Sequence, residues 1–306
     1  MIIYLKLVLT AVFWGGTFIA GRAIAPTVGP FSGAFLRFLF ASIFLVLLTL
    51  GSQGRFPKLE KRQILPVMLL GLTGVFAYNV LFLAGLKTVT ASRASIIIAN
   101  NPVFLALFSA IIFREHLGGQ KILGILLCLT GALIAISRGD PATLFHGAIG
   151  LGEILIFGCV VSWVAYSLIG KVVMLGMSPM SAVMYSSLFG ALFLFLPACG
   201  EGIIHEAQAY PMQIWSGILY LAFFGTTIGF TWFYEGIHVI GPARSGVFIN
   251  LVPVSAIALA AIILGEELNI SLLLGVLLVT GGIFLTNSTA SWKNREITLQ
   301  QASPDQ

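Results

Sequence analysis

The chain has 306 residues, of which 58% are hydrophobic and only 9% are charged, and its formal net charge is +5. Soluble domains have roughly 25% charged residues, so this composition excludes a water-soluble protein and indicates a chain embedded in a membrane. The basic residues gather in short connections between apolar runs rather than on a polar surface, which argues against nucleic acid as a partner.

Ten apolar runs follow one another along the chain, and each is long enough to cross a bilayer as a helix, which takes about 20 residues. They cover about residues 4–22, 32–50, 64–84, 92–113, 121–137, 150–170, 179–198, 213–235, 243–264 and 270–287. The first run has no charged region ahead of it and is bulky in its second half, so we interpret it as an uncleaved membrane helix. The predicted fold class is an all-α integral membrane protein with ten transmembrane helices.

The basic residues predict the orientation of these spans. Ten spans place both termini on the same side of the membrane, and 11 of the 16 Lys and Arg residues fall on that side, against 5 on the other. Because cytoplasmic loops carry the excess of Lys and Arg, we expect both termini in the cytoplasm and a multi-pass protein in the cell inner membrane. Residues 289–306 then form a polar cytoplasmic tail.

The two halves of the chain repeat each other at an offset of about 150 residues. The aligned pairs include Trp14 with Trp163, Pro30 with Pro179, Arg93 with Arg244, Pro102 with Pro253 and Glu115 with Glu266. Each half holds five spans, an odd number, so the second half enters the membrane from the opposite side and the repeat is inverted. The predicted units are two inverted five-helix repeats, residues 1–138 and 148–288. Inverted repeats suit a protein that must expose one site to either side of the membrane in turn.

The first and sixth spans carry matching stripes of aromatic and small residues, each on one helical face. The stripes are Thr10, Trp14, Thr17 and Gly21 in the first span and Cys159, Trp163, Tyr166 and Gly170 in the sixth. Such a face either packs against another helix or lines a cavity, and the sequence leaves both interpretations open. For a cavity, the candidate substrate-binding residues are Trp14, Thr17, Trp163 and Tyr166, joined by Tyr78 and Asn79 of the third span.

Two prolines interrupt the fourth and ninth spans at equivalent positions. Pro102 has no backbone N–H and frees the carbonyl of Ile98, and Pro253 does the same to Ile249. Three amides lie close to them: Asn100, Asn101 and Asn250. These amides either satisfy the kinked backbone or face a central cavity as substrate-binding residues, and the two roles are compatible.

Few charges fall inside the spans. Arg37 lies in the second span, where we expect it to snorkel outward or to stabilise a helix terminus. Glu115 and Glu266 follow the proline-bearing helices and are expected to cap or bridge the next turn. Glycines recur every seven residues in the fifth and tenth spans, at Gly124, Gly131, Gly275 and Gly282. They predict close helix packing, within the fold or in a homodimer.

Catalytic and metal sites are not indicated by the sequence. The four histidines and most acids lie near the ends of the spans without metal-ligand spacing, and the three cysteines show no paired spacing. The sequence contains no P-loop motif that would bind ATP. We therefore expect no enzyme activity, no cofactor and no metal, and a membrane-embedded enzyme is a remote alternative.

Several segments together resemble the EamA family of the drug/metabolite transporter superfamily. They are FWGGTFIAGR (13–22), ASRASIIIANNPVFLALFSAIIFREHLGGQKILGILLCLTGALI (91–134), VSWVAYSLIGK (161–171) and GPARSGVFINLVPVSAIALAAIILGEELNISLLLGVLLVTGGI (241–283). The resemblance covers nearly the full length and implies ten helices in two inverted repeats, cytoplasmic termini and transport of small solutes, often export of amino acids. Small four-helix relatives carry a coupling glutamate in the first helix, whereas the span from Tyr4 to Arg22 has no carboxylate.

The sequence thus predicts a secondary transporter that exports amino acids or related neutral or amphipathic solutes by alternating access. Its site would lie between the two halves and be rich in amides, hydroxyls and aromatic rings but poor in fixed charge. A channel or facilitative pore is the main alternative, against which the lack of a ring of charges or carbonyls argues. The expected partners are a small-molecule solute and the lipid bilayer.

Overall fold

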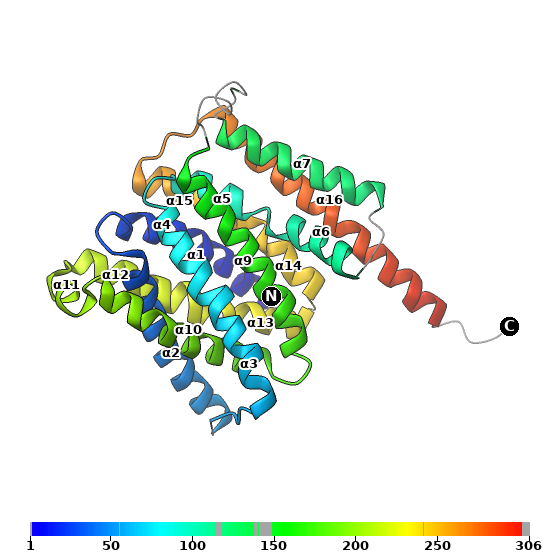
Figure 1. Ribbon diagram of the computed structural model, residues 1–306. Helices are drawn as coiled ribbons and strands as arrows, with labels where there is room; N and C mark the ends of the chain where they lie inside the picture. Colours follow the sequence, from blue (N-terminus) through cyan, green and yellow to red (C-terminus); the bar gives the residue numbers. More distant parts are fainter. Residues whose placement is uncertain are drawn as a thin grey trace.

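The computed structural model describes residues 2–54, 56–113, 118–137, 140, 149–240 and 242–301. Within these ranges the chain is all-helical, without a β-strand (Figure 1). The elements are α1 (Ile2–Ile24), α2 (Pro30–Gln53), α3 (Lys61–Leu70), η1 (Gly71–Ala77), α4 (Tyr78–Gly85), α5 (Ala91–Ile98), α6 (Asn101–Phe113), α7 (Gly119–Ile136), α9 (Leu151–Val173), α10 (Pro179–Gly200), α11 (Ile203–Ala209), α12 (Met212–Tyr220), η2 (Leu221–Ile228), α13 (Gly229–Ile240), α14 (Pro242–Ile249), α15 (Leu251–Leu264) and α16 (Ile270–Gln301).

Within the described ranges, seven helical segments are long and apolar enough to cross a membrane. They are 2–24, 30–51, 61–85, 119–136, 151–173, 179–200 and 212–236, and shorter apolar helices cover 251–264 and 270–285. Many large apolar side chains on these helices are exposed, which is the arrangement expected where lipid rather than water is the solvent. The all-helical architecture of a multi-pass membrane protein is therefore confirmed.

Two of the long segments contain π-helical turns at equivalent places. The turns η1 and η2 each continue without interruption from the preceding helix into the following one. A π-turn shifts the backbone bonding and leaves carbonyl oxygens that need other donors, and side chains supply them here. Asn79 Nδ2 donates to the carbonyls of Gly74 and Val75, and Thr226 Oγ1 donates to that of Leu221.

The predicted spans 92–113 and 243–264 are each broken into two helices. In the first span, α5 ends at Ile98 and α6 begins at Asn101, the residue before Pro102. In the second span, the break lies at Asn250, three residues before Pro253. Proline removes the N–H that would continue the helical ladder and crowds the preceding turn, so a break just before each proline is the expected consequence.

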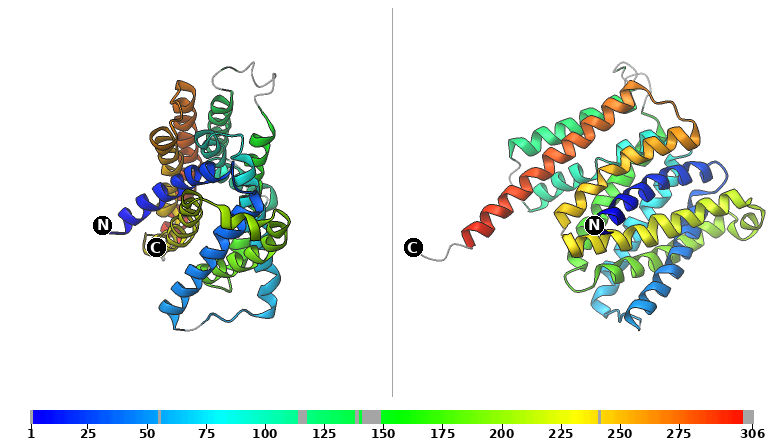
Figure 2. Two further views of the ribbon diagram at one scale, coloured as in Figure 1. Left: turned by 90° about the vertical axis from the view of Figure 1, so that its left-hand side faces the viewer. Right: turned by 180° about the vertical axis from the view of Figure 1, so that it is seen from behind.

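The helices of the two halves interleave rather than forming separate bundles (Figure 1). Helix α1 packs against α13 and α15 from the second half, and α9 packs against α4, α5 and α6 from the first half. Helices α2 and α10 lie against each other, and so do α7 and α16. Figure 2 shows α7 and α16 along one flank of the molecule, with the C-terminal part of α16 projecting beyond the other helices.

Glycines bring α7 and α16 into close contact. A methyl group added at Gly131 would lie 2.7 Å from the carbonyl oxygen of Gly275, and one added at Gly282 would lie 2.6 Å from that of Gly124. Backbones this close exclude any larger side chain at the crossing. The repeated glycines thus pack two helices of one chain, which was one of the two predicted roles.

Carboxylates from distant parts of the chain bind the start of two helices. Glu266 accepts hydrogen bonds from the backbone N–H groups of Ala91 and Ser92 at the start of α5, at 2.8 and 3.1 Å. Glu201 accepts one from the N–H of Ser32 in α2, at 2.7 Å. The expectation that Glu266 caps the turn next to it in sequence is corrected, because it caps a helix of the other half. Its counterpart Glu115 lies outside the described residues.

Two ion pairs also join helix ends that are far apart in the sequence. Lys6 in α1 pairs with Glu235 in α13 at 2.7 Å, and Arg93 in α5 pairs with Glu153 in α9 at 3.2 Å. Both pairs link a helix of the first half to a helix of the second half. Together with the glutamate caps, they tie the ends of helices from the two halves to one another.

Candidate functional site

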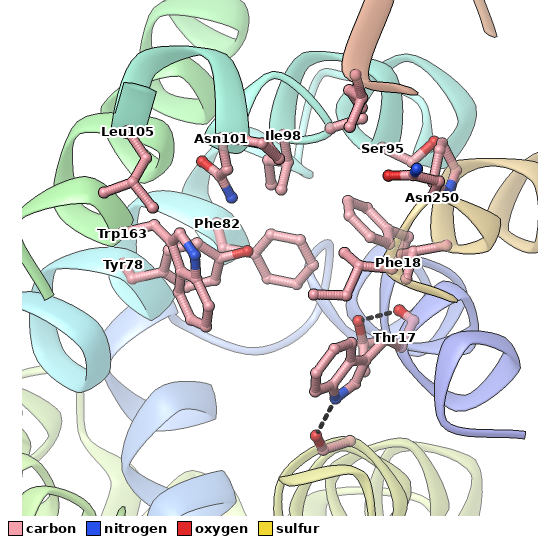
Figure 3. A pocket seen from close by; sticks show the side chains of 18 of the residues that line it. Thr17, Phe18, Tyr78, Phe82, Ser95, Ile98, Asn101, Leu105, Trp163 and Asn250 are labelled. Carbon is pink, nitrogen blue, oxygen red and sulfur yellow. Dashed lines mark hydrogen bonds between the residues drawn. The ribbon is translucent and has the colours of Figure 1, made fainter. Parts of the chain in front are cut away.

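A cavity of about 260 Å³ lies between the two halves of the chain (Figure 3). The residues that line it come from α1, α2, α4, α5, α6, α9, α13, α14, α15, α16 and the turn η2, that is, from both halves. Both helix breaks reach it, because Pro102 and Pro253 belong to its lining. The walls are mostly apolar, with a small number of polar side chains, as in typical small-molecule sites.

Six of the nine predicted binding residues line this cavity. They are Trp14, Thr17, Tyr78, Asn101, Trp163 and Asn250. Figure 3 shows the amides of Asn101 and Asn250 directed into the cavity from the broken helices, with Trp163 and Tyr78 across from Asn101. The stripe of the first span therefore meets the kinked helices of both halves at one place.

A smaller cavity of about 40 Å³ adjoins the first. Two further predicted residues, Asn79 and Tyr166, line it, together with buried serines of α10. Four residues line both cavities and thus form the wall between them: Arg37, Tyr78, Trp163 and Phe230.

Asn100, the ninth predicted residue, lines neither cavity. Its side chain is buried, and Nδ2 donates to the carbonyls of Ile96 at 2.9 Å and Ile97 at 3.3 Å. Its backbone N–H bonds to Ile97 instead of to Ile96, so the side-chain amide replaces the lost helical bond. Asn100 therefore satisfies the kinked backbone, although at these carbonyls and not at the predicted carbonyl of Ile98.

The two amides that face the cavity differ from Asn100 in position, since Asn100 Oδ1 is also buried without a hydrogen-bond partner among the described residues but Asn100 lies outside the cavity lining. Asn101 Oδ1 is buried and has no hydrogen-bond partner in the described part of the chain. The side chain of Asn250 makes no capping hydrogen bond to α15, although the residue occupies the cap position of that helix. A buried amide oxygen without a donor costs free energy, so Asn101 offers an acceptor to whatever enters the cavity.

Aromatic rings form a continuous wall on the side of α4 and α9. The ring of Trp163 lies 5.6 Å from that of Tyr78 and 5.4 Å from that of Tyr166, measured between centroids. On the other side, Trp14 lies 5.6 Å from Phe230, and its Nε1–H donates to the carbonyl of Gly225 at 2.9 Å. Trp14 is thus fixed by ring packing and by a hydrogen bond. Trp163 is held by contacts with the neighbouring rings.

Arg37 corrects one expectation from the sequence. It does not snorkel outward, because the residue is only 8% exposed and lines both cavities. Its Nη1 donates to Asn79 Oδ1 at 2.8 Å, and its Nε and Nη2 donate to Thr226 Oγ1 at 3.2 and 3.1 Å. The cavity is thus poor in fixed charge, as expected, but it borders one fixed positive charge.

Some lining residues were not among the candidates. They include Phe18, Phe82, Ser95, Phe230 and Arg37. Phe18 and Ser95 belong to spans that carry predicted residues, and no local pattern separates them from residues that only pack. Arg37 did have a signal, since it is a charge inside an apolar span, a position that is costly unless the charge has a use.

The donor groups of the site do not form a metal centre. Among the described residues, no group of three or more His, Cys, Asp or Glu side chains could hold a metal ion. The polar groups at the cavity are amides, hydroxyls, indole and phenol rings and one guanidinium, which bind a solute by hydrogen bonds and aromatic contact.

Comparison with known proteins places this site in a family context. A model of the EamA-like transporter family matches residues 1–137 and 150–288. The "Uncharacterized transporter YyaM" of Bacillus subtilis is 27% identical over 281 residues, covering 92% of each chain. The "Probable terminal-alkyne amino-acid exporter" of Streptantibioticus cattleyicolor is 28% identical over 293 residues, covering 95% of each.

Two further proteins are similar to this chain, one in sequence and one in fold. The "Probable amino-acid metabolite efflux pump" of Escherichia coli is 27% identical over 299 residues, covering 93% of this chain and 94% of the pump. A crystal structure with 20% sequence identity superposes with a TM-score of 0.63 and covers 93% of this chain and 96% of its own. At that identity the superposition supports the fold alone.

Proposed function

The chain belongs to the EamA-like transporter family, and from this premise we propose that it is a secondary transporter of the cell inner membrane. It exports amino acids or related amphipathic solutes by alternating access. The observation that carries the proposal is the cavity between the two halves, lined by side chains of both and reached by both proline-broken helices. A site at the interface of two repeats, beside broken helices, is the arrangement that alternating access uses.

The proposed architecture is ten spans in two inverted repeats, residues 1–138 and 148–288. Reciprocal packing supports it: α1 contacts α13 and α15, while its counterpart α9 contacts α4 and α6, the counterparts of those two helices. The pairs α2 with α10 and α7 with α16 are contacts between equivalent helices, as expected near a pseudo-two-fold axis. The family model also matches two ranges close to the proposed units.

Contacts between helix ends support the alternation of the spans. Lys6 and Glu235 belong to ends that the ten-span topology assigns to the cytoplasmic side, and they form an ion pair. Arg93 and Glu153 belong to ends assigned to the outer side, and they are also paired. With the excess of Lys and Arg on the side of the termini, this favours cytoplasmic termini.

The proposed binding residues belong to two groups: the aromatic wall on the side of α4 and α9, and the two amides that face the cavity. Trp163 and Tyr78 provide aromatic surface, and Asn101 and Asn250 provide hydrogen-bond groups for the polar part of a solute. Rocking of one repeat against the other exposes this site to either side in turn.

The relatives favour amino acids as the solute class. Two of them are named as a probable amino-acid exporter and a probable amino-acid metabolite efflux pump. A mostly apolar cavity with a few amides and one charge suits a small amphipathic solute of this kind.

Counterflow in liposomes tests the proposal. Purified protein is reconstituted into vesicles loaded with an unlabelled solute, and uptake of the same labelled solute is followed for amino acids, nucleosides and bases. Saturable uptake that requires the internal solute is expected for at least one amino acid. Flux that neither saturates nor exchanges would support a channel instead, and no flux of any compound would contradict the proposal.

A further inference from the structure

Arg37 is a charged side chain held inside the helical bundle, and no carboxylate of the described residues pairs with it. Its hydrogen-bond partners, Asn79 and Thr226, are neutral. The ion pairs found among the described residues join helix ends or lie in the loop at Glu60, and none includes Arg37. A guanidinium in this position lacks the counter-charge that usually accompanies a buried cation.

A structural role alone does not account for the charge. An uncompensated arginine inside a membrane protein is expensive, and such residues generally serve a functional site. The position equivalent to Arg37 in the second half, 149 residues later, is Ser186, which is buried and lines the smaller cavity. The fold therefore accommodates an uncharged side chain at this position of the repeat.

The guanidinium has donors left for a ligand. Of its five N–H groups, Nε–H and one on Nη2 are directed to Thr226, and one on Nη1 is directed to Asn79. One N–H remains on each terminal nitrogen, and Arg37 borders both cavities. Two N–H groups of one guanidinium match the two oxygens of a carboxylate, which gives both charge balance and geometry.

The amount of charge limits which anion fits. Among the described residues that line the two cavities, Arg37 is the only charged one. One guanidinium balances a single negative charge, whereas a phosphate group carries up to two at neutral pH. The apolar walls, which include Phe18 and Phe82, suit an uncharged remainder, and Asn101 Oδ1 can accept a hydrogen bond from an amino group.

We propose that Arg37 recognises the solute through its carboxylate, so that the substrates are amphipathic monocarboxylates such as apolar amino acids. The proposal rests on the transport function proposed above and narrows its solute class. It assigns to Arg37 a direct contact with the solute, while Asn79 and Thr226 orient the guanidinium.

The test compares solutes that differ only at the carboxyl group. Wild-type proteoliposomes are assayed for counterflow of L-phenylalanine, L-leucine and L-methionine and of their carboxamides, with nucleosides and bases as non-carboxylate solutes. The loss of one charge-assisted contact should make each carboxamide about 10- to 100-fold poorer than its acid in apparent affinity. Acids and carboxamides of equal affinity would overturn the role of Arg37 and leave the transport function standing.

The remaining outcomes of this comparison are also informative. Exchange of nucleosides or bases without exchange of any amino acid would overturn the carboxylate proposal alone. The absence of exchange for every compound would overturn the transport function and the carboxylate proposal together. The two hypotheses therefore fail in different ways.

Variants of Arg37 separate recognition from structure. Arg37→Gln should abolish the preference for acids while retaining transport of the carboxamides, and Arg37→Lys should retain part of the preference because it keeps the charge. Lys87→Gln is the control, since it removes one positive charge at an exposed position that lines neither cavity. Size-exclusion profiles verify folding. If Arg37→Gln does not fold, the preference of Arg37→Lys for acids over carboxamides tests the proposal. Equal losses for acids and carboxamides in the folded variants would indicate a structural role and contradict the proposal.

Discussion

Asn79 presents its oxygen, and not its amino group, to Arg37. The Nδ2 group of Asn79 donates to the carbonyls of Gly74 and Val75 in the π-helical turn, at 3.1 and 2.9 Å. This fixes the amide, so that Oδ1 accepts from Arg37 Nη1 at 2.8 Å. The π-turn of the third span and the charge of the second span are therefore coupled through one side chain, which holds the guanidinium at the wall of both cavities.

Asn79→Asp should weaken the binding of carboxylate-bearing solutes. The new carboxylate lies beside Arg37 and pairs with it, so a solute carboxylate must compete with an internal one. We expect the apparent affinity for amino acids to fall by about tenfold or more, with a smaller change for their carboxamides. Counterflow at a series of solute concentrations measures both, and an unchanged affinity for the acids would contradict a contact between Arg37 and the solute.

Neighbouring amides at the first helix break should respond in opposite ways. Both side chains carry a buried oxygen without a partner, but Asn100→Ala also removes two hydrogen bonds to the carbonyls of Ile96 and Ile97 inside the bundle, which should cost about 1–3 kcal/mol of stability. Asn101→Ala removes a buried oxygen without a partner, so stability should stay the same or rise while solute affinity falls. Thermal unfolding in detergent and counterflow distinguish the two, and equal effects of both variants on both measurements would disprove the assignment.

Trp163→Ala should impair solute binding more than folding. Trp163 borders both cavities and contacts the rings of Tyr78 and Tyr166, so its loss should raise the half-saturation concentration by about 2- to 10-fold. Trp215→Ala is the matched control, since Trp215 contacts Phe40 and lines neither cavity. A similar loss of affinity in the control variant would show that the change is not specific to the cavity.

The sequence could predict the faces and breaks of single helices, because these depend on local spacing and on proline chemistry. Trp14 and Thr17 share a face by periodicity and both line the cavity. Pro102 cannot continue a helix, and the span breaks just before it. Seven of the ten predicted runs also recur, within the described ranges, as helical segments long and apolar enough to cross a membrane.

Contacts between segments that are far apart in the sequence could not be predicted from local spacing. The burial of Arg37 depends on Asn79 and Thr226, which lie in other helices and are brought together only by packing. Asn100 and Asn101 are adjacent and chemically identical, yet one turns into the backbone and the other towards the cavity. The geometry of the helix break gives the two side chains different directions, and this geometry cannot be predicted from the residue type.

Glu266→Ala should destabilise the protein, while Glu267→Ala should have little effect. Glu266 accepts hydrogen bonds from Ala91 and Ser92 at the start of α5, and a carboxylate at a helix N-terminus contributes about 0.3–2 kcal/mol. Glu267 is its immediate neighbour but is exposed. Thermal unfolding of both variants provides the comparison, and a loss confined to Glu267→Ala, or equal losses, would contradict the cap.

Gly281→Ala and Gly282→Ala should have opposite effects on stability, although the two glycines are adjacent in α16. A methyl group at Gly282 would lie 2.6 Å from the carbonyl oxygen of Gly124 and 2.5 Å from Cys128 Sγ, so α7 and α16 must separate to admit it. Overpacking of this kind costs about 1–3 kcal/mol.

At Gly281, by contrast, no atom of the described residues beyond the adjoining backbone of α16 lies within 4 Å of the added methyl group, and alanine favours the helix by about 1 kcal/mol over glycine. Gly281→Ala should therefore leave the unfolding temperature unchanged or raise it, whereas Gly282→Ala should lower it. Both variants carry the same chemical change in the same helix, so propensity and side-chain entropy cancel in the comparison. A lower unfolding temperature for Gly281→Ala than for Gly282→Ala would mean that α16 presents a different face to α7.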